Sequence, residues 1–580
     1  MNLALRLVAT TALAGLLLTA PALSQGQFLD LAEGPSAAGS YLAGQEAMGE
    51  LSTPNAARYF AQAAADEWDN PLVIHAAFVA LAANGEIERS ADSARRMLEL
   101  EPTNQLAQLV IATEALKNRR YAAAIRDLDK LGSDSFEGIT GSILRAWALI
   151  GDGRYSEAMG SLDKVAENGL EEFLVFHRAI MAEVAGDRAA AQDYISQAIE
   201  VDAFTADVVD AYARILANAG RFDEALDAVV AFEAQGLNHP IISALKTQLA
   251  NRQRPTMFVD SVQAGAAQMF HSVGLAFARE GTTDISLVLE RLAQYLDPRN
   301  DTIPIVIGQL YDGAGQHELA NALYDGLPAS SLLKPMATVR VADNLDAMGD
   351  RPEAIRRLSN IIATNPDDID AISVLGDLLR ADKQFARSAD AYTQALAVTG
   401  GKSPADWRFY YVRGIAYERS DQFPLAEKDF LRALELNPNQ PQVLNYLGYS
   451  WVDKGMNLDR GLEMIEKAIE GAPNDGYIID SLGWAYYRLG RFEEAVGKLE
   501  EAALLRPADP EINDHLGDAY WRVGRKLEAT FQWKVAYAMD TEGNVKKRIE
   551  PKLKGGLDAA PVSEDSAPVE PAPGDQAAAN

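Results

Sequence analysis

The sequence predicts an all-α solenoid of about fourteen two-helix repeats, with a joint near residues 240–266. Three observations predict this fold. Small and aromatic residues recur with a 34-residue period over nearly the whole chain. Glycine and proline recur within the period at the positions where a helix is expected to end. The composition, with 48% hydrophobic and 23% charged residues, is that of a folded globular chain.

The period is clearest in two units that begin at Gly476 and Pro510. Counting the first residue as one, Gly at offset 8 and Ala at offset 20 are small, which lets the two helices of a unit cross closely. Gly at offset 15 accepts the left-handed conformation that ends a helix. The matching residues are Leu482-Gly483 and Leu516-Gly517, Tyr486 and Tyr520, Gly490 and Gly524, and Ala495 and Ala529.

These residues resemble the tetratricopeptide repeat (TPR), a helix–turn–helix unit of 34 residues. The resemblance implies a right-handed α-α superhelix whose first helices line a concave groove. In this frame the chain divides into segments with distinct roles. They are an N-terminal subarray of about six repeats at 37–239, a degenerate unit or joint at 240–266, a C-terminal subarray of about eight repeats at 267–543, a basic capping helix at 544–556 and a disordered acidic Pro/Ala tail at 557–580.

The first 24 residues have the features of a cleavable secretory signal peptide. Arg6 supplies a positive charge, Leu7 to Ala20 is almost wholly apolar, and Ala22 and Ser24 are small. The apolar run is short for a membrane span, and no later segment is long and apolar enough for one. We therefore expect a periplasmic protein with no integral membrane segment after the signal is removed.

Charge and residue usage narrow the chemistry. The net charge of −30 argues against nucleic acid as a partner, because phosphate binding needs clustered Lys and Arg. With no Cys in the chain, disulfides, thiol nucleophiles and Cys-based metal sites are excluded. The six histidines show no metal-ligand spacing; in His317-Glu318-Leu319-Ala320-Asn321, Asn321 replaces the second histidine of a zinc protease helix. We expect no metal, no cofactor and no catalysis.

The TPR resemblance also implies groove positions, at offsets 2, 5, 9, 12 and 13 of the first helix. Tyr, Trp and Arg, the residue types enriched at binding hot spots, occupy many of them in the C-terminal repeats. The N-terminal repeats are Ala-rich and predict a stiff spacer or a weaker second surface. The predicted groove residues are Tyr411, Arg419, Asn445, Tyr449, Tyr477, Asp480, Trp484, Tyr487, Arg488, Asp514, Asp518, Trp521 and Arg522, with Arg408, Glu418, Asp453 and Glu511 at equivalent offsets.

The function that these features favour is a non-catalytic scaffold or adaptor that binds a protein or an extended peptide. The C-terminal repeats are similar to those of large secreted proteobacterial TPR proteins, one branch of which serves as adaptor for carboxyl-terminal processing proteases. That similarity implies envelope biogenesis or regulated proteolysis, although the lipidated Cys of that branch is missing. The alternatives are a homo-oligomeric structural organiser and an enzyme with a site near 240–271, built from Arg252, Arg254, Asp260 and His271.

Overall fold

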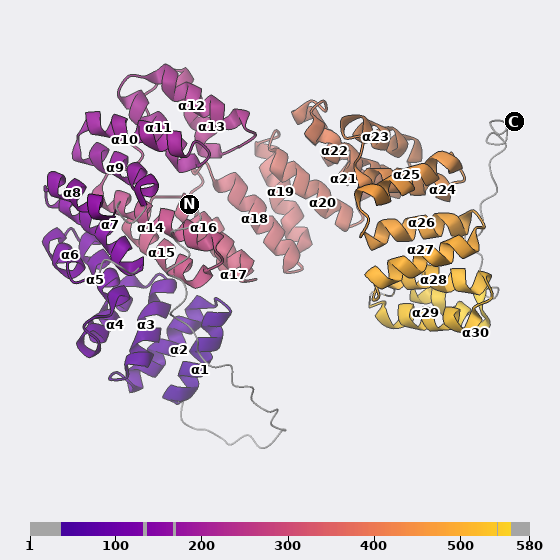
Figure 1. The fold of residues 1–580 in the computed structure, drawn as a ribbon, viewed down its shortest axis with the longest axis horizontal. Coiled ribbons are helices and arrows are strands. Elements are labelled where there is room, and N and C mark those ends of the chain that lie inside the picture. The colour runs from indigo at the N-terminus through magenta and orange to yellow at the C-terminus, as the bar shows by residue number, and fades with distance from the viewer. Residues whose placement is uncertain (1–35, 132–135, 166–169, 542, 544, 558–580) are drawn as a thin grey trace. The chain divides into compact units, whose positions relative to one another are not determined.

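The computed structural model describes residues 36–131, 136–165, 170–541, 543 and 545–557. Within these ranges every regular element is a helix, and none is a strand (Figure 1). The backbone forms two compact units, residues 1–350 and residues 351–580, which we call unit 1 and unit 2. The predicted signal peptide and nearly all of the predicted tail lie outside the described residues.

Unit 1 contains the first eighteen helices. From α1 to α12 and from α14 to α17, consecutive helices pair as the two halves of a repeat, whereas α13 and α18 have no second helix within this unit. The helices are α1 Ala37–Gly49, α2 Thr53–Asp66, α3 Pro71–Ala83, α4 Ile87–Leu100, α5 Gln105–Lys117, α6 Tyr121–Leu128, α7 Phe136–Gly151, α8 Tyr155–Val165, α9 Glu171–Ala185, α10 Arg188–Val201, α11 Ala206–Asn218, α12 Phe222–Ala234, α13 Pro240–Ala250, α14 Val262–Arg279, α15 Thr283–Leu296, α16 Thr302–Gly313, α17 His317–Gly326 and α18 Lys334–Ala347.

Unit 2 contains the remaining twelve α-helices and a short 3-10 turn, Pro404–Asp406. The helices are α19 Arg351–Thr364, α20 Ile369–Ala381, α21 Phe385–Thr399, α22 Trp407–Arg419, α23 Phe423–Leu436, α24 Pro441–Asp453, α25 Leu458–Gly471, α26 Gly476–Arg488, α27 Phe492–Leu505, α28 Pro510–Arg522, α29 Lys526–Met539 and α30 Lys546–Gly555. From α20 to α29, the even-numbered helices are the first helices of successive repeats.

The glycines of the repeat occupy the positions that the period predicts. Gly490 and Gly524 follow α26 and α28 with φ of 75° and 86°, the left-handed conformation that ends a helix. A Cβ on Gly483 would lie 2.6 Å from Leu499 Cγ, and one on Gly517 would lie 2.5 Å from the Trp533 ring. Glycine is therefore required where the first and second helices of a repeat cross. The predicted all-α repeat array with its joint is confirmed.

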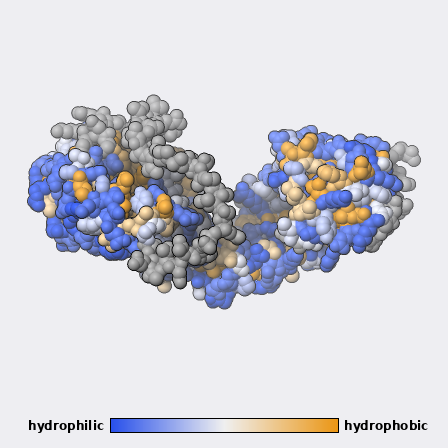
Figure 2. Space-filling model, turned by 90° about the horizontal axis from the view of Figure 1, so that it is seen from below, coloured by the Kyte–Doolittle hydropathy of each residue, from blue (hydrophilic) through white to orange (hydrophobic). Residues whose placement is uncertain are grey.

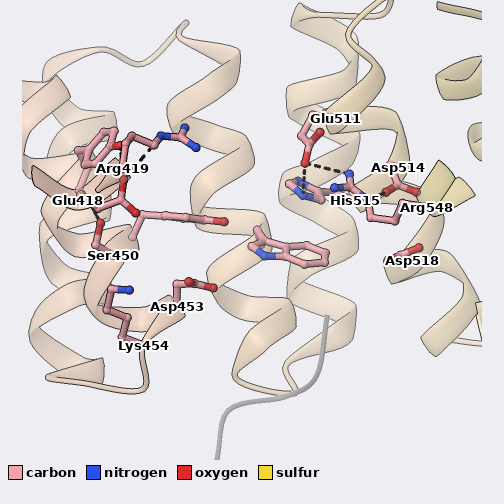
Figure 3. Close-up of a pocket in the computed structure, with 13 residues that line it drawn as sticks. Glu418, Arg419, Ser450, Asp453, Lys454, Glu511, Asp514, His515, Asp518 and Arg548 are labelled. Carbon is pink, nitrogen blue, oxygen red and sulfur yellow. Dashed lines mark hydrogen bonds and ion pairs between the residues drawn. The ribbon is translucent and has the colours of Figure 1, made fainter. Parts of the chain in front are cut away.

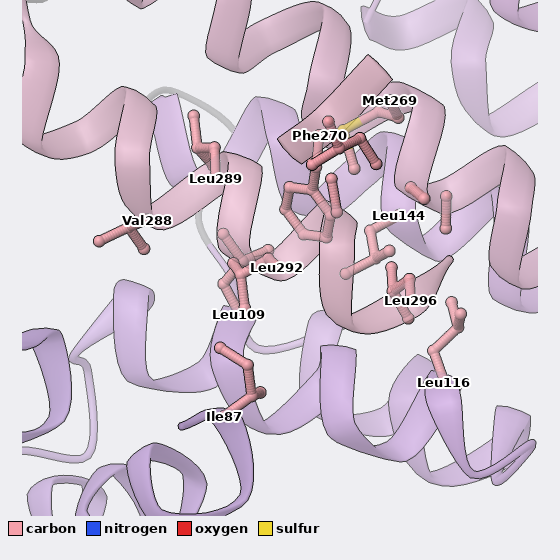
Figure 4. Packing of buried hydrophobic residues seen from close by; sticks show 14 of the residues in the cluster. Ile87, Leu109, Leu116, Leu144, Met269, Phe270, Val288, Leu289, Leu292 and Leu296 are labelled. Atoms are coloured by element: carbon pink, nitrogen blue, oxygen red, sulfur yellow. The ribbon is translucent and has the colours of Figure 1, made fainter. Parts of the chain in front are cut away.

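The core of unit 1 joins segments that are far apart in the sequence. Helices α14 and α15 pack against α3, α5, α7 and α9, which are first helices of the N-terminal repeats. Figure 4 shows Leu109 and Leu144 from those repeats beside Phe270 of α14 and Leu292 of α15, and all four belong to one buried apolar cluster. The first-helix face of the N-terminal array thus holds two helices of its own chain.

Close approach and hydrogen bonds fix this packing. A Cβ on Gly265 of α14 would lie 2.0 Å from the indole of Trp147, so only glycine fits against that ring. The Thr53 and Tyr311 hydroxyls lie 2.6 Å apart, and Lys117 Nζ donates to the Leu296 carbonyl at 3.1 Å. These contacts satisfy polar groups that burial would otherwise leave without partners.

The compact units do not coincide with the two predicted subarrays. The sequence places its division at 240–266, whereas α14 to α18 belong to unit 1, which ends at Asp350. The joint itself is a helix, α13, followed by a non-helical stretch at 251–261 that returns the chain to the N-terminal repeats. The 34-residue period predicts contacts only between neighbouring repeats, so it does not predict that the chain packs back against the N-terminal repeats.

Helix α30 packs on α29, at the position of the first helix of a further repeat. Its Lys552 is 3% exposed and donates to Asp514 at 2.8 Å and to both oxygens of Asp518 at 2.7 Å. The basic helix predicted at 544–556 is therefore joined to α28 by buried ion pairs. None of the helices in the described ranges has the length and apolar character needed to cross a bilayer.

Candidate binding cavity

A cavity of about 350 Å³ lies in unit 2, on the face formed by the first helices of the last repeats. Helices α22, α24, α26, α28 and α30 all contribute to its wall. Figure 3 shows Glu418 and Arg419 on one side and Glu511, His515 and Arg548 on the other. The lining residues are Glu418, Arg419, Tyr446, Tyr449, Ser450, Asp453, Lys454, Trp484, Glu511, Asp514, His515, Asp518 and Arg548.

A stack of three rings forms the middle of the wall. The indole of Trp484 lies 4.0 Å from the imidazole of His515 and 4.6 Å from the ring of Tyr487, with interplanar angles of 18° and 5°. Trp484 is only 4% exposed, and Tyr487 is fully buried. The stack is therefore a rigid apolar surface, and only the Trp484 and His515 members line the cavity.

Charged groups surround this stack, and most of them are paired. Arg548 donates to Asp514 at 2.6 Å and to Glu511 at 2.9 Å, while Asp514 and Asp518 also bind Lys552. Each buried carboxylate is thus compensated by a cation, as the cost of burying charge requires. Because these charges are paired, the wall is polar and fixed in geometry, and it carries no large area of positive or negative charge alone.

Among the lining residues whose pKa values are shifted, His515 and Asp518 matter most for the charge of the wall near neutral pH. Burial lowers the pKa of His515, but the Asp480 carboxylate 3.1 Å from Nδ1, together with Glu511 and Asp514, outweighs burial and leaves this pKa above its usual value. Burial, with repulsion from Asp514, raises the pKa of Asp518 to about 6, against the opposing effect of Lys552. The charge of the wall therefore depends on pH near neutrality.

The opposite rim offers accessible charges. Arg419 is exposed and lies 3.6 Å from Glu418, which also accepts a hydrogen bond from the Tyr446 hydroxyl at 3.1 Å. Lys454 is exposed, with its Nζ 5.0 Å from the centre of the Phe423 ring. Because Arg419 and Lys454 are exposed, a ligand can bind these two cations of the rim without breaking a buried ion pair.

The structure brings five of the thirteen predicted residues to the cavity wall: Arg419, Tyr449, Trp484, Asp514 and Asp518. Binding at these positions stays a prediction. The other eight lie outside the wall, and several of them support it from behind. Among these, Asp480 holds His515, Arg488 pairs with Asp453, and Tyr487 supports Trp484 while its hydroxyl accepts from Arg522 Nε at 3.2 Å; Tyr411, Asn445, Tyr477 and Trp521 complete the set.

Trp521 differs most from its predicted place. Its ring packs against Trp533, with ring centroids 5.4 Å apart, and against the end of α30, where a Cβ on Gly556 would lie 2.0 Å away. Tyr477 is 51% exposed, with the Arg506 guanidinium 4.9 Å from its ring centre. The offset of a residue in its repeat does not by itself predict whether that residue lines the cavity. For Trp521 and Tyr477, the surroundings depend on neighbouring helices and loops as well as on the first helix.

Sequence reasoning missed five lining residues: Tyr446, Ser450, Lys454, His515 and Arg548. Tyr446 and His515 are at offset 6 and Ser450 is at offset 10, one position beyond the predicted offsets 5 and 9. Two adjacent stripes of the first helix therefore reach the cavity. Arg548 is at offset 5 of a unit that would begin at residue 544, so extending the repeat frame into the capping helix finds it.

The candidates near the joint do not form one site. Arg252 pairs with Asp223, Asp260 pairs with Arg299, and His271 is buried against Glu290. Arg254 lines a cavity of about 330 Å³ in unit 1 that does not include the other three residues. There burial raises the pKa of Glu183 to about 7. Within the described ranges, no cluster of three or more His, Asp or Glu side chains could hold a metal ion.

Family models match three stretches of the chain. A model described as "Tetratricopeptide repeat" matches residues 342–400 and 373–441, and one described as "TPR repeat" matches residues 483–524. These stretches of the chain therefore contain tetratricopeptide repeats. Repeats of this kind bind protein partners, which supports a protein-interaction scaffold as the class of function.

Similar proteins match over part of their length. The TPR repeat-containing protein PA4667 of Pseudomonas aeruginosa is 29% identical over 167 residues, which is 29% of this chain and 28% of that protein. Human tetratricopeptide repeat protein 13 is 29% identical over 133 residues, 23% of this chain and 15% of that protein. The chain thus spans less than a third of either relative.

Solved structures of low identity align over most of the chain. The Cut9–Hcn1 hetero-tetramer of APC/C gives a TM-score of 0.37 at 14% identity, covering 89% of this chain and 96% of that chain. Yeast Tom70 gives a TM-score of 0.35 at 14% identity, covering 88% and 94%.

Proposed function

We propose that this protein is a non-catalytic scaffold that binds an extended segment of a protein partner in the cavity of unit 2. The observation that carries the proposal is the wall around Trp484, where a rigid aromatic surface lies between two charged rims. Buried aromatic anchors within a polar rim are typical of protein-binding hot spots.

The packing of unit 1 supports the choice of unit 2. In unit 1 the first-helix face is covered by α14 and α15, so a partner there would have to displace buried contacts such as Trp147 with Gly265. In unit 2 the equivalent face carries a cavity of about 350 Å³, which is large enough for one or two side chains of a peptide.

The wall also indicates the kind of peptide. The Trp484 surface suits an apolar or aromatic anchor side chain. On the rim, Arg419 and Lys454 suit an acidic residue, and Glu511 suits a basic one or a backbone N–H. We therefore expect an extended segment with one apolar anchor flanked by charged residues of both signs.

The place of action in this proposal is the periplasm, reached through a cleavable signal peptide at residues 1–24. The features that support it are Arg6, the apolar run after it and the small residues Ala22 and Ser24. Envelope biogenesis or regulated proteolysis is the proposed setting. Fractionation of cells that express the full chain, with and without charge substitutions in the apolar run, tests export.

Capture from an envelope extract tests the binding site. The cavity variant is Arg419→Glu with Lys454→Glu, and its control is Lys428→Glu with Lys467→Glu on α23 and α25. Both variants change net charge equally, and all four side chains are exposed. A protein retained by the wild type and the control but lost by the cavity variant supports the proposal. Equal retention by all three chains, or equal loss by both variants, contradicts it.

A further inference from the structure

A second surface of unit 2 lies on α29, away from the cavity. Four apolar side chains of this helix are exposed: Leu527 at 83%, Phe531 at 64%, Met539 at 47% and Tyr537 at 36%. Figure 2 shows apolar side chains gathered over this end of unit 2. We call Leu527, Phe531, Tyr537 and Met539 the α29 patch. Leu527 and Phe531 form the centre of the patch, and Tyr537 and Met539 lie on either side of it around the helix. Large exposed apolar groups of this kind mark a candidate binding surface.

The repeat shows that the patch is particular to α29. At the positions of Leu527 and Phe531, the preceding repeat has Glu493 and Gly497, and the one before it has Asp459 and Glu463. The apolar pair is four residues apart, so both side chains lie on one face of the helix. The period therefore does not require apolar residues at these positions.

Exposed lysines lie on α29 and on the helix packed against it, α30. Lys526 and Lys534 of α29 and Lys547 and Lys554 of α30 are exposed, and within the described residues none has a carboxylate partner. These lysines give the two adjacent helices a local excess of positive charge, although the chain as a whole carries a net charge of −30. The surface combines apolar and cationic groups, which suits an acidic segment with apolar side chains.

Such a segment begins beside the patch. Residues 558–580 contain five acids and no Lys or Arg, together with Val562 and Val569. Gly556 packs on Trp521, and Lys526 at the start of α29 lies 4.7 Å from the centre of that same ring. The 23 residues after Leu557 span up to ~75 Å when extended, against roughly 21 Å for α29.

We propose that residues 558–580 dock on the α29 patch of the same molecule. The valines cover Leu527 and Phe531, and the carboxylates neutralise Lys526, Lys534, Lys547 and Lys554. Docking in cis keeps the apolar end of unit 2 from associating with other surfaces, and an acidic partner would have to displace the segment to reach it. The inference is independent of the cavity and its ligand.

Distance measurement between two spin labels tests the docking in the full chain. Because the chain has no Cys, Val569→Cys with Gln532→Cys gives two unique labels, one in the segment and one on α29. The control pair is Val569→Cys with Lys428→Cys on α23. We expect a short, narrow distance distribution for the first pair that broadens at high salt and in the Lys534→Glu, Lys547→Glu background.

Three results would overturn the proposal. One is a broad distribution for the Val569–Gln532 pair at low salt, no narrower than that of the control pair. Another is a narrow distribution that charge reversal does not change, because the lysines would then contribute nothing. The third is a broad distribution together with lysine-dependent binding of the full chain to phosphatidylglycerol vesicles, which would make the patch a lipid-binding surface.

Discussion

The imidazole of His515 lies on the indole of Trp484, with ring centroids 4.0 Å apart and planes 18° from parallel. Asp480 holds the same imidazole through Nδ1, and Glu511 lies 3.6 Å from Nε2. A protonated His515 is therefore stabilised by two carboxylates and by the face of Trp484. His515 therefore contributes to both the shape and the charge of the cavity wall.

The pH dependence of stability follows from this arrangement. The pKa of His515 is raised above 6.5 in the folded chain, because Asp480, Glu511 and Asp514 together outweigh burial. Its contribution to the free energy of unfolding is therefore fully present below the unfolded-state pKa of about 6.5 and is lost as pH rises through the folded-state pKa. We expect the stability advantage of wild type over His515→Gln to shrink as pH rises above about 6.5.

Urea unfolding monitored by tryptophan fluorescence measures that difference, because five of the seven tryptophans lie in unit 2. Asp518, with a pKa of about 6, is present in both chains, so its own titration cancels in the difference. A wild-type advantage over His515→Gln that stays constant over this pH range would contradict the assignment.

Arg419 and Arg522 are at the same offset of their repeats, so the period predicts both in the groove, but only one of them lines the cavity. Arg419 lines the cavity, whereas Arg522 contacts the Tyr487 hydroxyl outside it. Arg419→Ala should weaken binding of the partner about tenfold, or ~1.4 kcal/mol, with no change in unfolding midpoint because the side chain is exposed. Calorimetric titration with the captured partner measures it, and Arg522→Ala should leave the affinity unchanged.

Removing one cation should detach the last helix. Lys552→Met leaves the buried Asp514 and Asp518 without their shared ammonium, a cost of ~3–5 kcal/mol. Hydrogen exchange of α30 amides should then accelerate while exchange in α20 to α23 stays the same. Adding Asp514→Asn and Asp518→Asn should restore much of the protection, since no uncompensated charge would remain; continued fast exchange would show that packing, not charge, was lost.

The docking of α14 against the N-terminal repeats depends on Gly265. Gly265→Ala places a methyl group 2.0 Å from the Trp147 ring and should destabilise unit 1 by ~1–3 kcal/mol. Gly160→Ala is the control: this helical glycine of α8 has open space around it, so the same change should stabilise by up to ~1 kcal/mol. Circular dichroism during urea unfolding measures both, and equal effects would refute the close contact.

The sequence predicts the repeat array because its determinants are local. Gly483 and Gly490 act on residues of their own repeat, so the 34-residue period reports helix ends and crossings directly. The same period predicts which face Arg419, Tyr449 and Trp484 occupy, since all belong to first helices. The geometry within each repeat can therefore be predicted from a single sequence.

Contacts between repeats that are distant in the sequence cannot be predicted from the period. Leu109 packs in the same cluster as Leu292, but both would look like ordinary core residues in any pair of adjacent repeats. His515 was missed for a related reason. Its role depends on Asp480, 35 residues earlier, and on the Trp484 ring, and neither partner belongs to its own repeat.

The return of α14 and α15 to the N-terminal repeats has a consequence for the order of folding. During synthesis at ~5–20 residues per second, Leu109 and Leu144 leave the ribosome roughly 10 to 40 s before α15 is complete. Over that interval the face that α15 will cover is an open apolar surface. Unit 1 therefore cannot complete its folding one repeat at a time, as an array with contacts only between neighbouring repeats would. Its last folding step requires α14 and α15, which are synthesised much later than the N-terminal repeats. Chaperones that bind exposed apolar surface have their longest opportunity to act during this interval.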